Sequence, residues 1–154
     1  MTKQKIEKEF IYQGLGFPVV LKNVPMVQLH GVWTPDLDYN TLQKVVLVAL
    51  AHHPADLTGN QIHFIRVWLG LTQIQFGKLL GVTHPAVVKW EKTKNKPSKI
   101  SLSTQRELRL YLLDHLLSKD EDFRKAFKII ISVTKYKSIA RALEVDVPTD
   151  LIAV

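Results

Sequence analysis

The chain of 154 residues contains no cysteine. Disulfides, thiolate zinc sites and cysteine nucleophiles are therefore excluded. Long apolar runs are also missing, since no stretch approaches the roughly 20 apolar residues that a membrane-spanning helix requires. The N-terminus, M-T-K-Q-K-I-E-K-E-F, lacks the apolar centre of a secretory signal. We therefore expect a cytoplasmic protein with no membrane segment.

Patterns for catalysis or metal binding are lacking as well. The 6 histidines are scattered, and none forms an H-x-x-x-H pair or a tight set with carboxylates. No Ser-His-Asp or paired-carboxylate arrangement stands out. We therefore expect no enzyme activity, no metal site and no cofactor.

Positive charge is concentrated in one part of the chain, whose formal net charge is +7. Residues 58–100 contain seven Lys or Arg and one Asp or Glu, a net charge of +6. The residues before this block are neutral overall, and those after it carry +1. Such a block is typical of a surface that contacts a polyanion, although a solvated basic face would give the same count.

The N-terminal part has the composition of strands and turns. Residues 9–34 are rich in β-branched and aromatic side chains and are interrupted by Gly and Pro. We expect two or three short strands, the clearest being 19–22 and 26–32. Apolar residues then recur at helical spacing until Pro54 ends the pattern. Residues 1–56 are thus expected to form a strand and helix region.

Two short helices are expected after this region. Thr58 is a suitable N-cap for the first, which should end at Gly70. Thr72 is a suitable N-cap for the second, which should end at Gly81. Helices this short bury little surface individually, so we expect them to pack as one unit with the helix that follows.

The third helix contains a proline close to its start. Val87 and Trp90 are expected to point inward, while Pro85 is acceptable because the first N–H groups of a helix have no intrahelical partner. A residue that precedes proline is pushed out of the α region, so we predict His84 as the N-cap, with Thr83 as the alternative.

Three motifs follow one another in this segment. L-T-Q, L-L-G-V-T and K-W-E lie at residues 71–73, 79–83 and 89–91. Their order and spacing resemble the Xre/Cro type of helix-turn-helix domain. The resemblance implies that the first motif opens one helix, that Gly81 permits the turn, and that Trp90 seals the underside of the next helix.

The expected fold is α+β and mainly α, with a five-helix-type helix-turn-helix domain and a small N-terminal β-rich region. The DNA-binding domain should span 57–117, followed by a C-terminal helical extension over 118–154. Leucines mark a helix at 102–117, and Phe and Ile mark another at 123–131. These two helices either form a dimer contact or extend the core, while the last residues show no clear helix.

In such a domain the second motif helix lies in the major groove. The resemblance implies DNA contacts at Gln73, Thr83, His84, Pro85, Val88, Lys89, Lys92, Lys94 and Lys96. Lys89 could donate to guanine or neutralise a phosphate, and His84 could donate to a base edge or to a phosphate. Pro85 and Val88 could make apolar contacts only. Glu91 is expected to orient the lysines beside it or to form a local ion pair.

The other positions are expected at the sugar-phosphate backbone. Gln73 begins its helix, where the helix dipole favours a phosphate. Thr83 either caps the following helix or touches a phosphate. Lys92, Lys94 and Lys96 should follow the backbone, with a solvated loop as the alternative for the last two.

A narrower resemblance extends to the MqsA and HigA antitoxins. It rests on Y-Q-G at residues 12–14, V-P-M at 24–26 and L-T-G-N-Q-I-H-F-I-R at 57–66. The chain departs from the MqsA pattern because it lacks two C-x-x-C pairs, so no zinc is implied. The resemblance implies the antitoxin of a type II toxin-antitoxin pair, which represses its own operon and neutralises an RNase-type toxin through its N-terminal region.

A stand-alone Xre-family regulator is the alternative, with an N-terminal region for dimerisation or ligand sensing. In either case we expect a homodimer on palindromic double-stranded DNA, because one recognition helix reads only a few base pairs. The N-terminal region is not acidic, which weakens the electrostatic argument for a basic toxin as its partner.

Overall fold

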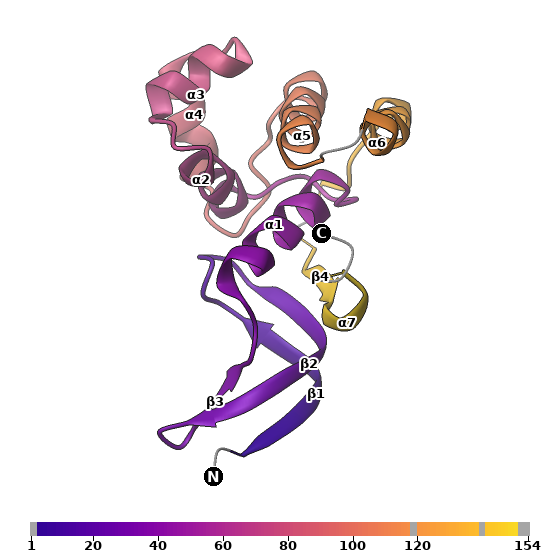
Figure 1. Cartoon of the computed structure of the whole chain (residues 1–154). Coiled ribbons are helices and arrows are strands. Elements are labelled where there is room, and N and C mark those ends of the chain that lie inside the picture. Colours follow the sequence, from indigo (N-terminus) through magenta and orange to yellow (C-terminus); the bar gives the residue numbers. More distant parts are fainter. Residues whose placement is uncertain (1–2, 118–119, 139–140, 151–154) are drawn as a thin grey trace. The chain divides into compact units, whose positions relative to one another are not determined.

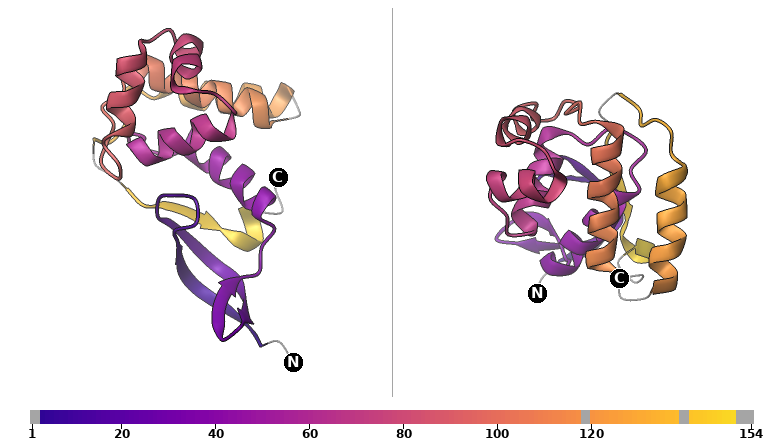
Figure 2. Two further views of the ribbon diagram at one scale, coloured as in Figure 1. Left: turned by 90° about the vertical axis from the view of Figure 1, so that its left-hand side faces the viewer. Right: turned by 90° about the horizontal axis from the view of Figure 1, so that it is seen from above.

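The computed structural model describes residues 3–117, 120–138 and 141–150. It contains two compact units, one of residues 1–49 and 142–154 and the other of residues 50–141. We call them the sheet unit and the helical unit (Figures 1 and 2). The elements in chain order are β1 (Gln4–Tyr12), β2 (Val19–Leu29), β3 (Val32–Pro35), α1 (Tyr39–Ala51), α2 (Gly59–Trp68), α3 (Gln73–Leu80), α4 (His84–Glu91), α5 (Leu102–Leu116), α6 (Asp120–Ser132), β4 (Leu143–Asp146) and α7 (Val147–Asp150).

The expected fold class, α+β and mainly α, is confirmed. The boundaries of the two units differ from the expected domain boundaries at 56/57 and 117/118. α5 and α6 belong to the same unit as α2 to α4, whereas β4 pairs with β2 in the sheet unit. A four-residue strand joins a sheet by backbone hydrogen bonds, which leave little trace in side-chain periodicity. No helix among the described residues has the length and apolar character to cross a bilayer.

β2 is the central strand of the sheet unit. It pairs antiparallel with β1 from Val19↔Tyr12 to Val27↔Gln4. Its second half pairs antiparallel with β3, and its first half pairs parallel with β4. α7 follows β4 as a single turn, so the expectation of no helix at the chain end is wrong.

The two strands expected at 19–22 and 26–32 form one strand and part of a hairpin. β2 runs through residues 23–25, which were expected to separate the two strands, and Asn23 takes a φ of 53° there. The buried side chains change from Val19 and Leu21 before this residue to Val24 and Met26 after it. A local irregularity therefore replaces the expected turn, and the chain reverses later, at His30 and Gly31.

The caps expected for α2 and α3 are confirmed. The Thr58 hydroxyl accepts from the Gln61 backbone N–H at 3.2 Å, and the Gln61 side chain accepts from the Thr58 N–H at 3.0 Å. Thr72 and Gln75 form the same reciprocal capping box at the start of α3. Gly81 ends α3 with a φ of 68°, which an L side chain rarely adopts.

α2 and α4 approach each other closely at Gly59. A Cβ at this position would lie 2.8 Å from the Glu91 carbonyl oxygen and would also meet the Trp90 carbonyl. The core around this contact contains fully buried Ile65 and Val87, with Trp90 8% exposed. The inward direction expected for the two side chains of α4 is thus confirmed, and their burial orients its opposite face outward.

α5 and α6 lie side by side in the helical unit (Figure 2). Leu108, Leu112 and Leu113 of α5 are buried, so the leucine-rich helix extends the core. α6 contributes Ala126 and Ile130 to the same core. Phe123 of α6 packs half-buried against this core, whereas Phe127, Ile129 and Ile131 are exposed.

Candidate nucleic-acid interface

The N-cap of α4 is Thr83 and not the predicted His84. The Thr83 hydroxyl accepts from the Ala86 N–H at 3.3 Å, and its backbone is extended, with φ −79° and ψ 156°. His84 is the first helical residue and Pro85 the second. The prediction of His84 as N-cap is therefore wrong, and the alternative holds because a threonine hydroxyl satisfies an unpaired N–H of the first turn.

The outer face of α4 carries the predicted base-contacting residues. His84, Pro85 and Lys89 are exposed, and Val88 is half-buried. Val87 and Trp90, which alternate with them in sequence, are buried in the core. Helical periodicity thus presents one face of α4 to solvent while the other anchors it.

α3 and α4 meet at their first residues. His84 Nε2 lies 3.3 Å from Gln73 Oε1, within hydrogen-bonding distance. Both side chains stand at helix N-termini, where unpaired backbone N–H groups and the helix dipoles favour a negatively charged partner. These two helix starts therefore form one surface suited to a phosphate group.

A groove of about 320 Å³ lies beside this contact. It brings together four of the predicted positions, Gln73, Val88, Lys92 and Lys94, with Asn60, His63 and Glu91. These residues come from α2, α3, α4 and the linker that follows, so the fold collects on one surface residues that are up to 34 positions apart.

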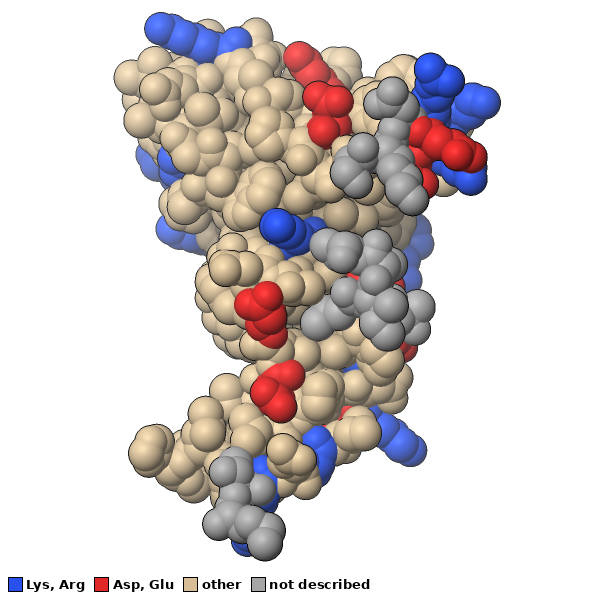
Figure 3. Space-filling view, viewed as in Figure 1, with Lys and Arg blue, Asp and Glu red and all other residues tan. Residues whose placement is uncertain are grey.

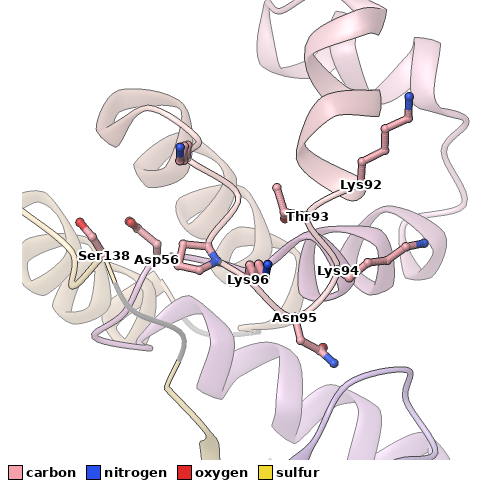
Figure 4. Close-up of a pocket in the computed structure, with 9 residues that line it drawn as sticks. Asp56, Lys92, Thr93, Lys94, Asn95, Lys96 and Ser138 are labelled. Carbon is pink, nitrogen blue, oxygen red and sulfur yellow. The ribbon is translucent and has the colours of Figure 1, made fainter.

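The linker lysines also border a larger cavity, of about 1010 Å³. Lys96 lies here with Lys99, Asp56 and Ser138, and the structure does not place it in the smaller groove. Lys92 and Lys94 project to the same side in Figure 4, away from Asp56 and Ser138. These two lysines thus connect the groove and the larger cavity.

The linker backbone is held in place at its centre. The Asn60 N–H donates to the Lys94 carbonyl at 2.9 Å, and the Asn60 side chain donates to the Asn95 side chain at 3.0 Å. Lys94 has a φ of 57°, in the left-handed region. The exposed lysine side chains of this linker therefore extend from a backbone that is bonded to the start of α2.

Glu91 pairs with α2, and the predicted pairing with its lysine neighbours is wrong. Arg66 donates to both carboxylate oxygens, from Nε at 2.8 Å and from Nη2 at 2.9 Å. His63 Nδ1 lies 2.7 Å from the same carboxylate, and Arg66 Nη1 donates to the Leu71 carbonyl at 2.9 Å. Burial raises the pKa of Glu91, but hydrogen bonds from Arg66 and His63 outweigh it and lower the pKa.

This ion pair neutralises Glu91, the one acidic residue of the basic block 58–100. The Glu91 and Arg66 side chains are only 9% and 13% exposed. On the face seen in Figure 3, the surface over α3 is mostly uncharged, with Lys or Arg at its edge and no Asp or Glu. Arg66 could not be identified from the sequence as the partner of Glu91, because no helical spacing rule links residues 25 positions apart.

Residues 62–103 match the family HTH_3, described as helix-turn-helix. This segment is an Xre-type helix-turn-helix domain. The domain is a DNA-binding module of transcription regulation, and the match runs from α2 into the start of α5. Neither the curated proteins nor the solved structures gave a match to the chain.

The Xre-type domain contains all nine predicted positions within the matched residues. Among the described residues of the chain, no group of three His, Asp or Glu side chains is placed to hold a metal ion. The chemistry that this surface offers is therefore hydrogen-bond donation and positive charge, the two features that recognise nucleic-acid backbones and base edges.

Proposed function

We propose that the chain is a sequence-specific DNA-binding transcriptional repressor, with α4 as its recognition helix. The observation that carries the proposal is the exposed face of α4, held against the core by Val87 and Trp90. On this face Lys89 donates to guanine O6 and N7, and His84 donates to an acceptor on a base edge. Pro85 and Val88 supply apolar contacts, for example with a thymine methyl.

The remaining positions bind the sugar-phosphate backbone. Gln73 lies at the N-terminus of α3 beside His84, and both its amide and the helix dipole suit a phosphate. Thr83 uses its hydroxyl as the α4 cap, so its contribution to DNA is positional. Lys92, Lys94 and Lys96 neutralise phosphates, which makes binding dependent on salt.

The repressor acts as a homodimer on palindromic DNA, because a second recognition helix doubles the base pairs read. The exposed Phe127, Ile129 and Ile131 of α6 support this helix as the dimer contact. Leu108, Leu112 and Leu113 of α5 are buried in the core and are not available for that role.

We further propose that the chain is the antitoxin of a type II pair, which represses its own operon and neutralises an RNase-type toxin. The sheet unit carries exposed apolar side chains that suit a protein partner, among them Ile6 and Val32, which are 74% and 64% exposed. Charged side chains lie between the exposed Ile6 and Ile11 of β1. Among the described residues β1 pairs with β2 alone, so its outer edge offers backbone groups.

The second candidate is a stand-alone Xre-family regulator. Its N-terminal region would serve dimerisation or ligand sensing, and the same exposed apolar residues, Ile6 and Val32, support the dimerisation role. Co-purification of the tagged chain with the product of its genomic neighbour separates the two candidates. Capture of a small basic protein whose toxicity the chain suppresses supports the antitoxin, whereas a chain that purifies alone supports the regulator.

The DNA-binding proposal is tested by selecting bound fragments from sheared genomic DNA and titrating the selected site against a scrambled duplex. We expect a palindromic site upstream of the chain's own gene, bound at least about 1,000-fold more tightly than the scrambled duplex. Equal affinity for both duplexes would refute sequence-specific recognition.

A further inference from the structure

A second cavity, of about 300 Å³, lies in the helical unit away from α4. The end of α1, α5 and the segment that follows α6 form its walls. Its volume is at the lower end of the range for sites that hold small molecules. The residues that line it are Ala51, His52, His53, Pro54, Arg109, Ile129, Ile130, Val133, Lys135, Tyr136 and Lys137.

Among the described residues, the lining of this cavity is basic and contains no acidic side chain. Arg109 is 0% exposed, and no carboxylate bonds directly to it in the described part of the chain. Lys135 and Lys137 add two exposed cations at the rim. A buried guanidinium without a carboxylate is rare because removal from water costs several kcal/mol.

Carbonyl oxygens satisfy one side of Arg109. Its Nη1 donates to the Leu50 carbonyl at 3.2 Å and also to that of His53, and its Nη2 donates to the Ala55 carbonyl at 2.8 Å. These bonds hold the end of α1 and the turn that follows. The Nε–H of Arg109 takes part in none of these bonds. Burial lowers the pKa of Arg109 to about 10, so the side chain remains charged at pH 7.

Two buried donors at this cavity have no hydrogen-bond partner among the described residues, namely Arg109 Nε and the Tyr136 hydroxyl. The Tyr136 ring lies 3.8 Å from the Arg109 guanidinium carbon, so the two donors belong to one cluster. An unsatisfied buried donor is unfavourable because it has lost its bonds to water, and the cost is larger for a charged group. An acceptor that reaches both would recover that cost.

We propose that this cavity binds a small organic carboxylate with an apolar body. The carboxylate accepts from Arg109 Nε and the Tyr136 hydroxyl, and the apolar body packs against Ile130 and Val133. Burial, reinforced by the charge of Arg109, lowers the pKa of His52, so this neighbour is neutral at pH 7 and the buried positive charge is that of Arg109.

The cavity is connected to the start of the helix-turn-helix domain. Arg109 Nη2 donates to Gln105 Oε1 at 2.6 Å, and the same oxygen accepts from the Leu57 N–H at 3.0 Å. Leu57 precedes Thr58, the N-cap of α2. Two hydrogen bonds therefore connect a ligand-binding Arg109 to Leu57, the residue before the N-cap of α2. A regulatory effect of that ligand on DNA binding rests on the proposed function.

Binding is tested on the full chain without DNA. The probes are acetate, hexanoate, octanoate, benzoate and phenylacetate, each compared with its neutral amide, by thermal unfolding and calorimetric titration. We expect at least one of the larger carboxylates to raise Tm through preferential binding to the folded state, with little effect of acetate or of the amides. Equal stabilisation by an acid and its amide, or none by any acid, would overturn the proposal.

Tyr136→Phe provides the matched variant. The hydroxyl has no partner in the described structure, so its removal costs no hydrogen bond and the variant should fold. We expect carboxylate affinity to fall about tenfold or more, the loss of one hydrogen bond to a charged group. Tyr111→Phe, on α5 outside the lining, should bind as the parent does.

Ile129→Trp adds a test that does not depend on the hydroxyl. Ile129 is 59% exposed and lines the cavity, so a larger ring can occupy the space with little cost to the core. We expect loss of carboxylate binding with an unchanged circular dichroism spectrum, because the substituted side chain lies outside the core. Retained carboxylate affinity in both Ile129→Trp and Tyr136→Phe would place the ligand elsewhere and overturn the proposal, while leaving the DNA-binding proposal intact.

Discussion

His84 Nε2 and Gln73 Oε1 lie 3.3 Å apart and join the first residues of α4 and α3. The contact sets the two helix N-termini side by side, so their dipoles and unpaired N–H groups act on one volume. A DNA phosphate placed there would contact both helix N-termini while α4 lies in the major groove. In the proposed complex, Gln73 positions the DNA backbone while α4 reads the bases.

Lys89→Ala should weaken specific DNA binding by about 1–3 kcal/mol, because the ammonium contributes a base contact as well as charge. The measurement is a titration of operator and scrambled duplexes at fixed salt. Lys44→Ala, an exposed substitution on α1 in the sheet unit, controls for the loss of one charge. Unchanged operator affinity in Lys89→Ala would reject α4 as the recognition helix.

Lys94→Ala and Lys96→Ala should lower affinity for all sequences alike, because both lysines are assigned to phosphates. Removing one ammonium that neutralises a phosphate should reduce the slope of log affinity against log salt by roughly 0.9. The check is a salt series on operator and scrambled DNA. A weaker affinity for the operator alone would show that these side chains read bases.

Gly59→Ala should destabilise the helical unit, since its Cβ would meet the backbone carbonyls of Trp90 and Glu91, which cannot rotate away. Overpacking of this kind costs about 1–3 kcal/mol. Urea unfolding followed by circular dichroism measures the change, with Lys44→Ala as a surface control. Parental stability in Gly59→Ala would show that α2 and α4 separate at little cost.

Glu91→Gln should reduce stability at pH 7, because it leaves Arg66 without its carboxylate partner. The folded-state pKa of Glu91 lies below the ordinary value of 4.5, so its ionisation stabilises the fold above that value. This contribution disappears as pH falls through the lowered pKa. The stability gap between the parent and Glu91→Gln should therefore narrow as the pH falls below about 4.5.

Urea midpoints measured at pH 7 and at acidic pH test the Glu91 prediction. Glu107→Gln is the matched control, because Glu107 is exposed on α5. A gap that stays constant over this pH range would show that the ionisation of Glu91 contributes nothing to the stability of the fold.

The local signals around α2 and α3 made their ends predictable. Thr58 and Thr72 stand before helical patterns with a glutamine three residues later, and Gly81 follows the last apolar residue. Such caps form within one turn of the backbone, so they require no knowledge of distant residues. The Xre-type domain was visible in the sequence for the same reason, because its motifs are short and ordered.

Other features depended on residues far apart in the chain. β4 pairs with β2 more than 120 positions away, and Asn23 extends a strand where the sequence favoured a turn. Arg66 reaches Glu91 only because α2 and α4 cross at Gly59. Local periodicity contains no record of such partners.

The N-caps of α2 and α3, the helical periodicity and the basic block follow from the sequence alone, because each arises from the chemistry of neighbouring residues. The tertiary structure alone decided that Thr83 and not His84 caps α4, and that Arg109 is enclosed beside Tyr136 without a carboxylate. The N-cap of α4 is the residue whose oxygen accepts from the Ala86 N–H. The burial of Arg109 depends on packing around α5. Both are decided by geometry between segments, which the order of residues does not specify.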